Sequence, residues 1–165
     1  MIFVNKRVVG LLAAVVLAIP GLAACTHGRA AATVGPASPV PNPSLNLPQG
    51  NLAIDRSGTR ELFLHVQIAE TDQAREAGLM NVKRMSDQVG MAFVFKVSTS
   101  TAFWMKDTLI PLDIAFWDGQ GRIVDTFTMT PCTADPCHLY QPATPYIGSV
   151  EMNTGLLAAN GVQVL

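Results

Sequence analysis

Short segments rich in β-branched and aromatic residues constrain the fold of this chain more than any other feature. Within residues 61–69, apolar side chains recur at every second position, which is the period of a strand with one buried face. Comparable segments, separated by turn-forming residues, follow at residues 90–95, 101–106, 112–117, 122–129 and 146–153. The pattern predicts a mainly β, compact β-sandwich or barrel-like domain with one or two short helices.

Two segments have helical rather than strand character. In residues 71–80, Thr71 can cap the first amide groups, Asp72 suits the positive N-terminal end of a helix, and Gly78 is placed to end it. Residues 154–161 predict a short closing helical turn. We therefore expect small helices added to a β domain.

The N-terminal segment has the features of a bacterial lipoprotein signal in their expected order. Lys6 and Arg7 precede an apolar run at residues 8–19, and small residues then lead to Cys25. This order resembles a lipobox and predicts a signal peptide at residues 1–24 and a lipid anchor, including palmitate, on Cys25. An ordinary signal peptide, or a short membrane anchor with an incidental cysteine, is the alternative. The expected location is the cell membrane, facing the extracytoplasmic side.

Residues 25–50 differ in composition from the rest of the chain. They are rich in Ala, Pro, Ser, Asn and Gly, and such a segment buries too little apolar surface to offset the entropy of ordering it. We expect a disordered tether here and a folded domain at residues 51–165. The formal net charge of -1 gives no indication of nucleic-acid binding. The expected partner is the membrane, contacted through the lipid on Cys25.

The sequence WDGQGR at residues 117–122 predicts a hairpin. A short loop within it gives three cross-strand pairs: Trp117 with Arg122, Ala115 with Val124, and Asp113 with Thr126. In this register a guanidinium can stack on an indole, and a carboxyl can accept a hydrogen bond from a threonine. The opposite face gathers the side chains that we expect in the core: Leu112, Ile114, Phe116, Ile123 and Phe127.

Charged residues interrupt the otherwise apolar stretch at residues 103–124. Burying an unpaired charge is costly, so these groups either satisfy one another or line a site. Together with polar residues near the C-terminus, they give the candidate ligand-site residues Trp104, Lys106, Asp107, Asp113, Glu151 and Asn153.

Three interpretations of this set remain open. In the first, Lys106 pairs with Asp113 or Glu151 and pins neighbouring strands. In the second, the residues line a concave site for a small polar or saccharide ligand, which makes the protein a binding or accessory module of the cell envelope. In the third, paired carboxylates perform acid–base or nucleophilic chemistry in an envelope hydrolase acting on saccharide-type substrates.

No motif assigns a catalytic residue or implies a cofactor. The chain has no nucleophile elbow, phosphate-binding loop or His-rich metal motif. His65 fits a solvent-facing strand position better than a metal site, since no second histidine lies nearby. Whether the protein is an enzyme stays open, and the binding interpretation is favoured.

Cys132 and Cys137 remain once Cys25 is lipidated. In an exported domain, two cysteines so close in sequence predict a disulfide, and the turn-forming pair Asp135 and Pro136 helps them approach each other. A metal site is an alternative, although two cysteines and His138 do not complete a tetrahedral zinc site. Free or exchange-active thiols are another alternative.

Five motifs occur in an order and spacing that resemble one known prokaryotic family. They are AREAGLM, GMAFVF, FWMKDTLIPLDIAFWD, PCTADPCHLY and VEMNTG, beginning at residues 74, 90, 103, 131 and 150. The chain resembles the family called domain of unknown function 192. The resemblance implies a compact, mainly β fold with a sandwich-like core, found alone or behind secretion signals, and it transfers no catalytic residue. Departures are Asp107, where the family usually has Asn, and Asn81 and Val82, where it usually has an apolar residue and Arg.

Overall fold

The computed structural model describes residues 2–6, 41–56 and 60–162. Cys25, residues 7–24 of the expected signal peptide and residues 25–40 of the expected tether lie outside this part of the chain. Within the described residues, no helix combines the length and apolar character needed to cross a bilayer.

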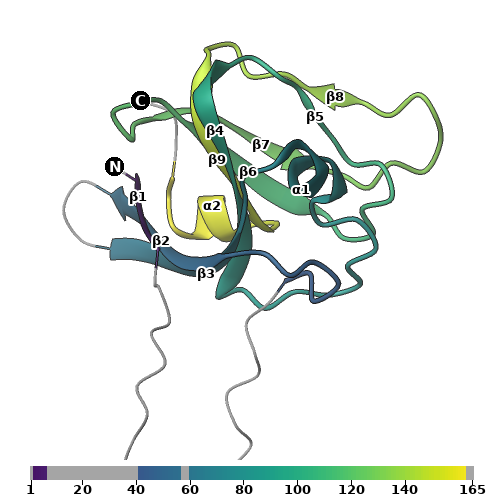
Figure 1. The fold of residues 1–165 in the computed structure, drawn as a ribbon, viewed down its shortest axis with the longest axis horizontal. Helices are drawn as coiled ribbons and strands as arrows, with labels where there is room; N and C mark the ends of the chain where they lie inside the picture. Colours follow the sequence, from purple (N-terminus) through teal and green to yellow (C-terminus); the bar gives the residue numbers. More distant parts are fainter. Residues whose placement is uncertain (1, 7–40, 57–59, 163–165) are drawn as a thin grey trace, which may run out of the picture. The chain divides into compact units, whose positions relative to one another are not determined.

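The domain is mainly β, as the sequence predicts (Figure 1). Seven strands form one sheet in the order β1-β2-β3-β4-β9-β6-β7, and β5 and β8 form a separate two-stranded sheet. Among the described strands, β3 and β4 are the only neighbours that pair in parallel. The large sheet is open rather than closed into a barrel, because β1 and β7 lie at its two edges. The elements are β1 (Ile2–Lys6), β2 (Gln49–Arg56), β3 (Arg60–Ala69), α1 (Asp72–Ala77), β4 (Val89–Thr99), β5 (Phe103–Trp104), β6 (Leu112–Trp117), β7 (Ile123–Met129), β8 (Leu139–Tyr140), β9 (Tyr146–Asn153) and α2 (Leu156–Ala159).

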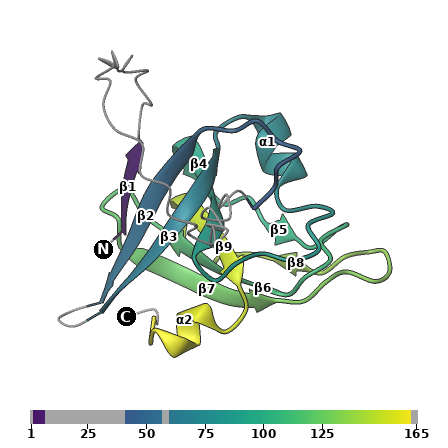
Figure 2. The ribbon, with the colours of Figure 1, turned by 90° about the horizontal axis from the view of Figure 1, so that it is seen from below.

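Both faces of the central strands are buried. Every residue of β6 is buried, so its odd and even positions serve two different clusters. One cluster contains Ala115 and Trp117 and packs under α2, with Leu157 of that helix included. The other contains Ile114 and Phe116 and packs under α1 and the β5-β8 sheet. The two helices lie on opposite sides of the large sheet in both views (Figures 1 and 2).

The folded domain begins earlier than the boundary expected at residue 51. The Asn42 backbone N–H donates to Gln67 Oε1 at 2.8 Å, and the Asn42 side chain donates to the Gly78 carbonyl at 2.9 Å. Leu45 and Leu47 pack against the cluster under α1. The segment from residue 41 onward is therefore anchored by side-chain hydrogen bonds between residues distant in sequence, which composition alone does not reveal.

The β6-β7 hairpin forms, but its register differs from the predicted one. Asp113 faces Thr128 rather than Thr126, because an irregularity lies between Phe116 and Trp117. The Asp118 carboxylate accepts hydrogen bonds from the backbone N–H groups of Gln120 and Arg122, both at 2.9 Å. This clamp builds a longer turn than expected and shifts the pairing.

Two further details of that prediction are wrong for the same reason. Arg122 pairs with the Asp118 carboxylate at 2.7 Å and does not stack on Trp117. Ile123 pairs with Trp117 and packs in the cluster under α2. Ile123 is therefore on the opposite face from Phe116, with which the predicted register grouped it.

The two expected helices are confirmed. Thr71 Oγ1 accepts a hydrogen bond from the Ala74 N–H at 3.2 Å, and Gly78 ends α1 with φ 43°, where glycine is favoured. The closing helical turn is α2. The segment expected at residues 101–106 is reduced to the two residues of β5. Strands β1, β2 and β8 lie in segments where no strand was expected, and β1 falls within the expected signal peptide.

Cys132 and Cys137 are joined as a disulfide, with an S–S distance of 2.08 Å. The Cys132 N–H donates to the Met105 carbonyl at 3.3 Å. The disulfide loop is thereby fastened to the segment that follows β5.

Candidate functional site

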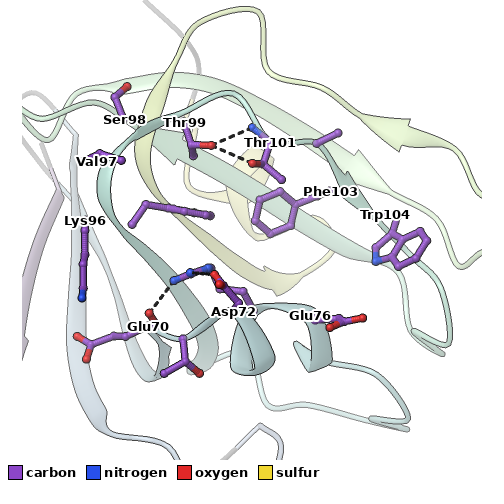
Figure 3. A pocket seen from close by; sticks show the side chains of 14 residues that line it. Glu70, Asp72, Glu76, Lys96, Val97, Ser98, Thr99, Thr101, Phe103 and Trp104 are labelled. Atoms are coloured by element: carbon purple, nitrogen blue, oxygen red, sulfur yellow. Dashed lines mark hydrogen bonds and ion pairs between the residues drawn. The ribbon is translucent and has the colours of Figure 1, made fainter.

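A groove of about 900 Å³ lies between α1, the second half of β4 and the segment containing β5 (Figure 3). Its floor and walls come from parts of the chain distant in sequence. The lining residues are Glu70, Thr71, Asp72, Arg75, Glu76, Phe95, Lys96, Val97, Ser98, Thr99, Thr101, Ala102, Phe103 and Trp104.

The groove exists because β4 is longer than its parallel neighbour. The pairing of β3 with β4 ends at Ala69 and Phe93, where the chain leaves the sheet towards α1. Strand β4 continues to Thr99, and its pairing with β9 is interrupted between Val94 and Thr99. The space where β3 would have continued is thus open and forms part of the groove.

Arg75 of α1 fixes the base of the groove. One terminal nitrogen, Nη1, donates to the Glu70 carbonyl at 2.7 Å and to the Val94 carbonyl at 2.9 Å. The other, Nη2, pairs with Asp72, and the guanidinium lies 4.7 Å from the centroid of the Phe95 ring. These contacts hold the side chain in one place, so that it presents a preorganised cation at the groove.

Aromatic side chains form the opposite wall. Phe103 is anchored in the core by edge-to-face contacts with Phe93 and Phe116, at centroid distances of 5.0 and 5.4 Å. The next residue, Trp104, points outward and is 44% exposed. The Tyr146 hydroxyl donates to the Thr101 carbonyl at 2.7 Å, and burial raises the pKa of that hydroxyl above its usual value.

A small chamber of about 30 Å³ adjoins the groove and shares four of its lining residues. Glu151 of β9 lines this chamber and is only 5% exposed. None of the hydrogen bonds among the described residues reaches its carboxyl group. Burial without a donor raises the pKa of Glu151 to about 8, so the neutral carboxylic acid predominates at neutral pH. The chamber has room for about one water molecule.

Three of the candidate site residues meet at this chamber: Trp104, Lys106 and Glu151. Lys106 Nζ lies 5.7 Å from the centroid of the Trp104 ring and 3.7 Å from the Asp135 carboxylate. The side chain of Lys106 is 42% exposed. Its ion-pair partner is therefore Asp135, instead of Asp113 or Glu151 as the sequence suggested.

Asp113 lies on the other side of the sheet and has a structural role. Its carboxyl accepts hydrogen bonds from Thr128 Oγ1 at 2.9 Å and from the Leu157 N–H at 3.1 Å. The second bond ties the first turn of α2 to β6. The predicted hydrogen bond from a threonine of the paired strand to Asp113 is present, but the threonine is Thr128 and not Thr126.

Asp107 and Asn153 also stand apart from the groove. Asp107 has φ 53°, a left-handed conformation in which Asn and Asp are the favoured residues after Gly. This backbone requirement accounts for the usual Asn at this position in the family that the sequence resembles. Asn153 Nδ2 donates to the Met85 carbonyl at 2.8 Å and to the Asp87 carboxylate at 2.7 Å, which places it at a loop junction.

Sequence reasoning missed the residues that build the groove, above all Arg75 and Phe95. Arg75 reads as an ordinary surface residue of a short helix, and Phe95 reads as the last core residue of a strand. The interrupted pairing of β4 exposes both of them. No local sequence signal marks that interruption.

Two other expectations can be placed in the structure. His65 Nδ1 lies 2.7 Å from Asn51 Oδ1 on the solvent-facing side of the β2-β3 pair, as expected for a strand residue. The side chains of Cys132, Asp135 and Cys137 approach within 4.8 Å of one another. Because the two sulfurs are bonded to each other, they do not supply the thiolates that a metal would require.

Comparisons with known proteins agree with this fold. The model of DUF192, described as an uncharacterized ACR, matches residues 53–164. A crystal structure of a protein of unknown function from Novosphingobium aromaticivorans is similar with a TM-score of 0.68 and 25% identity, covering 82% of this chain and 95% of that one. A putative transcription regulator from Sinorhizobium meliloti is similar with a TM-score of 0.62 and 30% identity, covering 68% and 84%. No curated protein matches the chain.

Proposed function

The chain belongs to the DUF192 family, and we propose that this member is a lipid-anchored binding module of the cell envelope, with its ligand held in the groove between α1, β4 and β5. The observation that carries the proposal is the combination of a fixed cation, Arg75, with an exposed ring, Trp104, across one groove. Binding sites need prepositioned polar groups and apolar walls, and this groove has both.

The dimensions of the groove suit a ligand of moderate size. Its volume lies within the range of about 300 to 1,000 Å³ that is common for ligand sites. Phe95 and Trp104 offer ring faces on which an apolar or flat group can stack. A polar ligand, such as the saccharide suggested by the sequence, would use the rings for stacking and the charged rim for hydrogen bonds.

Membrane anchoring is the second part of the proposal. It is supported by the sequence features that lead to Cys25 and by the disulfide between Cys132 and Cys137, which is typical of exported domains. The segment between Cys25 and Asn42 would let the domain reach ligands at some distance from the bilayer.

A hydrolase is the second candidate, because two carboxyl groups, those of Glu76 and Glu151, line the same chamber. Glu151 also has the raised pKa of a general acid. The chamber, however, has room for about one water molecule and not for a glycosidic linkage. A non-enzymatic binding function is therefore the better supported of the two.

Native mass spectrometry of protein extracted gently from its own membrane tests both parts. We expect an adduct mass of a co-purified ligand, lost in Trp104→Ala and retained in the control Phe63→Ala, whose ring is 61% exposed on β3 and does not line the groove. We also expect Cys25→Ala to release the protein from the membrane or to leave its precursor uncleaved. An adduct that survives Trp104→Ala would contradict the groove as its site, and normal cleavage with full membrane retention would contradict the lipid anchor.

A further inference from the structure

We propose that the small chamber beside the groove binds a primary ammonium group of the ligand. In this arrangement the carboxyl group of Glu151 receives the ammonium group, and Phe103 and Trp104 contact the body of the ligand in the groove. This inference rests on the proposed binding function and names the chemical class of the ligand, a primary amine.

Glu151 occupies a position where an apolar side chain would be expected. It lies on the central strand β9, in register with Met91 of β4 and Ile114 of β6. Both neighbours are fully buried in the apolar cluster under α1. A carboxyl group at such a position lowers stability unless it has a partner, and no hydrogen bond among the described residues reaches it. Strands paired on both sides hold it in place, so the chain presents a fixed acceptor for a group that it does not itself supply.

The size of the chamber limits what can enter it. Its volume of about 30 Å³ holds about one water molecule, and the nitrogen of a primary ammonium group is a single heavy atom of similar size. The chamber adjoins the end of the groove where Glu76 and Trp104 lie (Figure 3), and both residues line the two spaces. A group in the chamber can therefore be attached to a larger body in the groove.

The charges around the chamber favour a cation over a neutral group. Two carboxyl groups line it, those of Glu76 and Glu151. Arg75 and Lys106 line it too, but each pairs with a carboxylate that does not. Burial raises the pKa of Glu151, and no cation among the described residues lowers it. An ammonium group would supply the missing positive charge in contact with the carboxylate.

The chamber also contains a second acceptor. Thr108 is 7% exposed, and its hydroxyl donates to the Lys106 carbonyl at 3.4 Å. The hydroxyl oxygen retains lone pairs that can accept a hydrogen bond. An ammonium group has three N–H donors, whereas a ligand hydroxyl group has one donor and no charge. The acceptors of the chamber therefore match an ammonium group better than a hydroxyl group.

Binding exchanges the proton of Glu151 for the ammonium group. Because burial raises the pKa of Glu151 to about 8, its carboxyl group carries a proton at neutral pH. The entering ammonium group keeps its own protons, and the carboxyl O–H bond breaks and releases one proton to water. The affinity for an amine should therefore rise with pH towards pH 8, as the ionised fraction of Glu151 grows. The other charged groups of the chamber are Arg75 and Glu76 of α1 and Lys106 of the segment after β5, and its lining residues from β4 and from the turn after α1 carry no charge.

Three small probes test the inference on the purified protein. Benzylamine carries a ring and a primary ammonium group, benzyl alcohol replaces that group with a neutral hydroxyl, and N,N-dimethylbenzylamine keeps the charge on a nitrogen too large for the chamber. NMR titration, followed by the ¹³C shift of the Glu151 carboxyl and by the Trp104 indole signal, gives the three affinities. We expect benzylamine to bind at least about tenfold more tightly than either of the other two.

Two variants that each remove one negative charge separate the chamber from general attraction. Glu151→Gln should weaken benzylamine binding at least about tenfold and abolish its pH dependence between pH 6 and 8. Asp107→Asn is the control, because Asp107 does not line the chamber and its φ of 53° suits Asn. This control should change the affinity by less than about twofold, since solvent and salt screen an exposed charge. Equal weakening by the two variants would overturn the site.

The remaining outcomes distinguish this inference from the proposed function. Equal affinity for benzyl alcohol would overturn the cation, and equal affinity for N,N-dimethylbenzylamine would overturn the chamber; neither comparison needs a variant that folds. Absence of any shift at Glu151 with benzylamine, and with the smaller methylamine, would also overturn the inference. A co-purified ligand without an amino group, lost in Trp104→Ala and retained in Glu151→Gln, would overturn the ammonium site and keep the binding function. Benzylamine binding that depends on Glu151 and is unchanged in Trp104→Ala would contradict the contact with Trp104 and the groove as the ligand site, and would support only the chamber.

Discussion

Two buried carboxyl groups on adjacent strands behave in opposite ways. Asp113 of β6 and Glu151 of β9 are 2% and 5% exposed, and they point to opposite faces of the sheet. Asp113 has hydroxyl and backbone donors around it and fastens α2. Glu151 has no donor among the described residues and borders a chamber beside the groove. Burial alone therefore does not distinguish a carboxyl with a structural role from one at a binding site. The presence or absence of hydrogen-bond donors around the carboxyl distinguishes them.

The other polar groups on the two faces of the large sheet differ in the same way as Asp113 and Glu151. On the side of α2, hydrogen bonds and aliphatic packing close the surface. On the side of α1, the hydroxyl of Ser149 is also buried without a partner in the part of the chain described, and residues 95–98 of β4 are not in register with β9. Native proteins tend to tolerate such unsatisfied groups where function requires them.

The largest effect on stability is expected at Asp113. Asp113→Ala removes two hydrogen bonds to a carboxylate, those from Thr128 Oγ1 and the Leu157 N–H, and leaves the Leu157 N–H buried without an acceptor, so we expect a loss of about 3 to 5 kcal/mol in the free energy of unfolding. Urea denaturation measures it. Asp135→Ala is the control, because that side chain is 74% exposed and its ion pair is long. Similar losses of stability in the two variants would contradict the structural role of Asp113.

Glu151 is expected to make the domain less stable as the pH rises. Its pKa is about 8 in the folded state against 4.5 in the unfolded state, so the unfolded chain gives up this proton first. Below pH 4.5 the group is neutral in both states, and between pH 4.5 and 8 the folded state progressively loses stability. The loss amounts to as much as about 5 kcal/mol, since each unit of pKa shift corresponds to about 1.4 kcal/mol.

Glu151→Gln separates this contribution from those of other groups. The amide does not titrate, so the stability curve of the variant should be flatter between pH 5 and 8, and at pH 8 the variant should be as stable as the wild type or more stable. A variant whose pH dependence matched that of the wild type would show that Glu151 does not cause it.

Loss of the disulfide is expected to have an intermediate effect. Replacing Cys132 and Cys137 with alanine should lower the free energy of unfolding by about 2 kcal/mol, because the closed loop is short. The change should also loosen the loop from Met105, which accepts the Cys132 N–H. Thiol labelling of the unreduced, denatured wild type should find neither cysteine free, and labelling of both would refute the pairing.

The smallest effect is expected at Lys106. Its side chain is 42% exposed and its partner Asp135 is 74% exposed, so Lys106→Met should change stability by less than about 1 kcal/mol. A loss as large as that of Asp113→Ala would mean that Lys106 neutralises Glu151 inside the protein, contrary to the arrangement described above.

The sequence predicted the β class, α1 with its cap, and strands β6 and β9 to the residue, because alternation and capping are local signals. It did not predict the hairpin register, which depends on the clamp formed by Asp118, or the packing of Asn42 on Gln67. The candidate site was found in part: Trp104, Lys106 and Glu151 meet at one chamber. Arg75 and Phe95 were missed because no local sequence pattern indicates that β3 ends beside Phe93 while β4 continues to Thr99.

The central claim is that Glu151 lies buried on the site face without a hydrogen-bond donor. Titration of the Glu151 side-chain carboxyl, followed by its ¹³C chemical shift in the folded protein, tests that claim most directly, and Glu151→Gln assigns the signal. We expect a midpoint at about pH 8. A midpoint near 4.5 would contradict the account, because it would mean that water or a donor stabilises the charged form and that Glu151 differs little from an ordinary surface carboxyl.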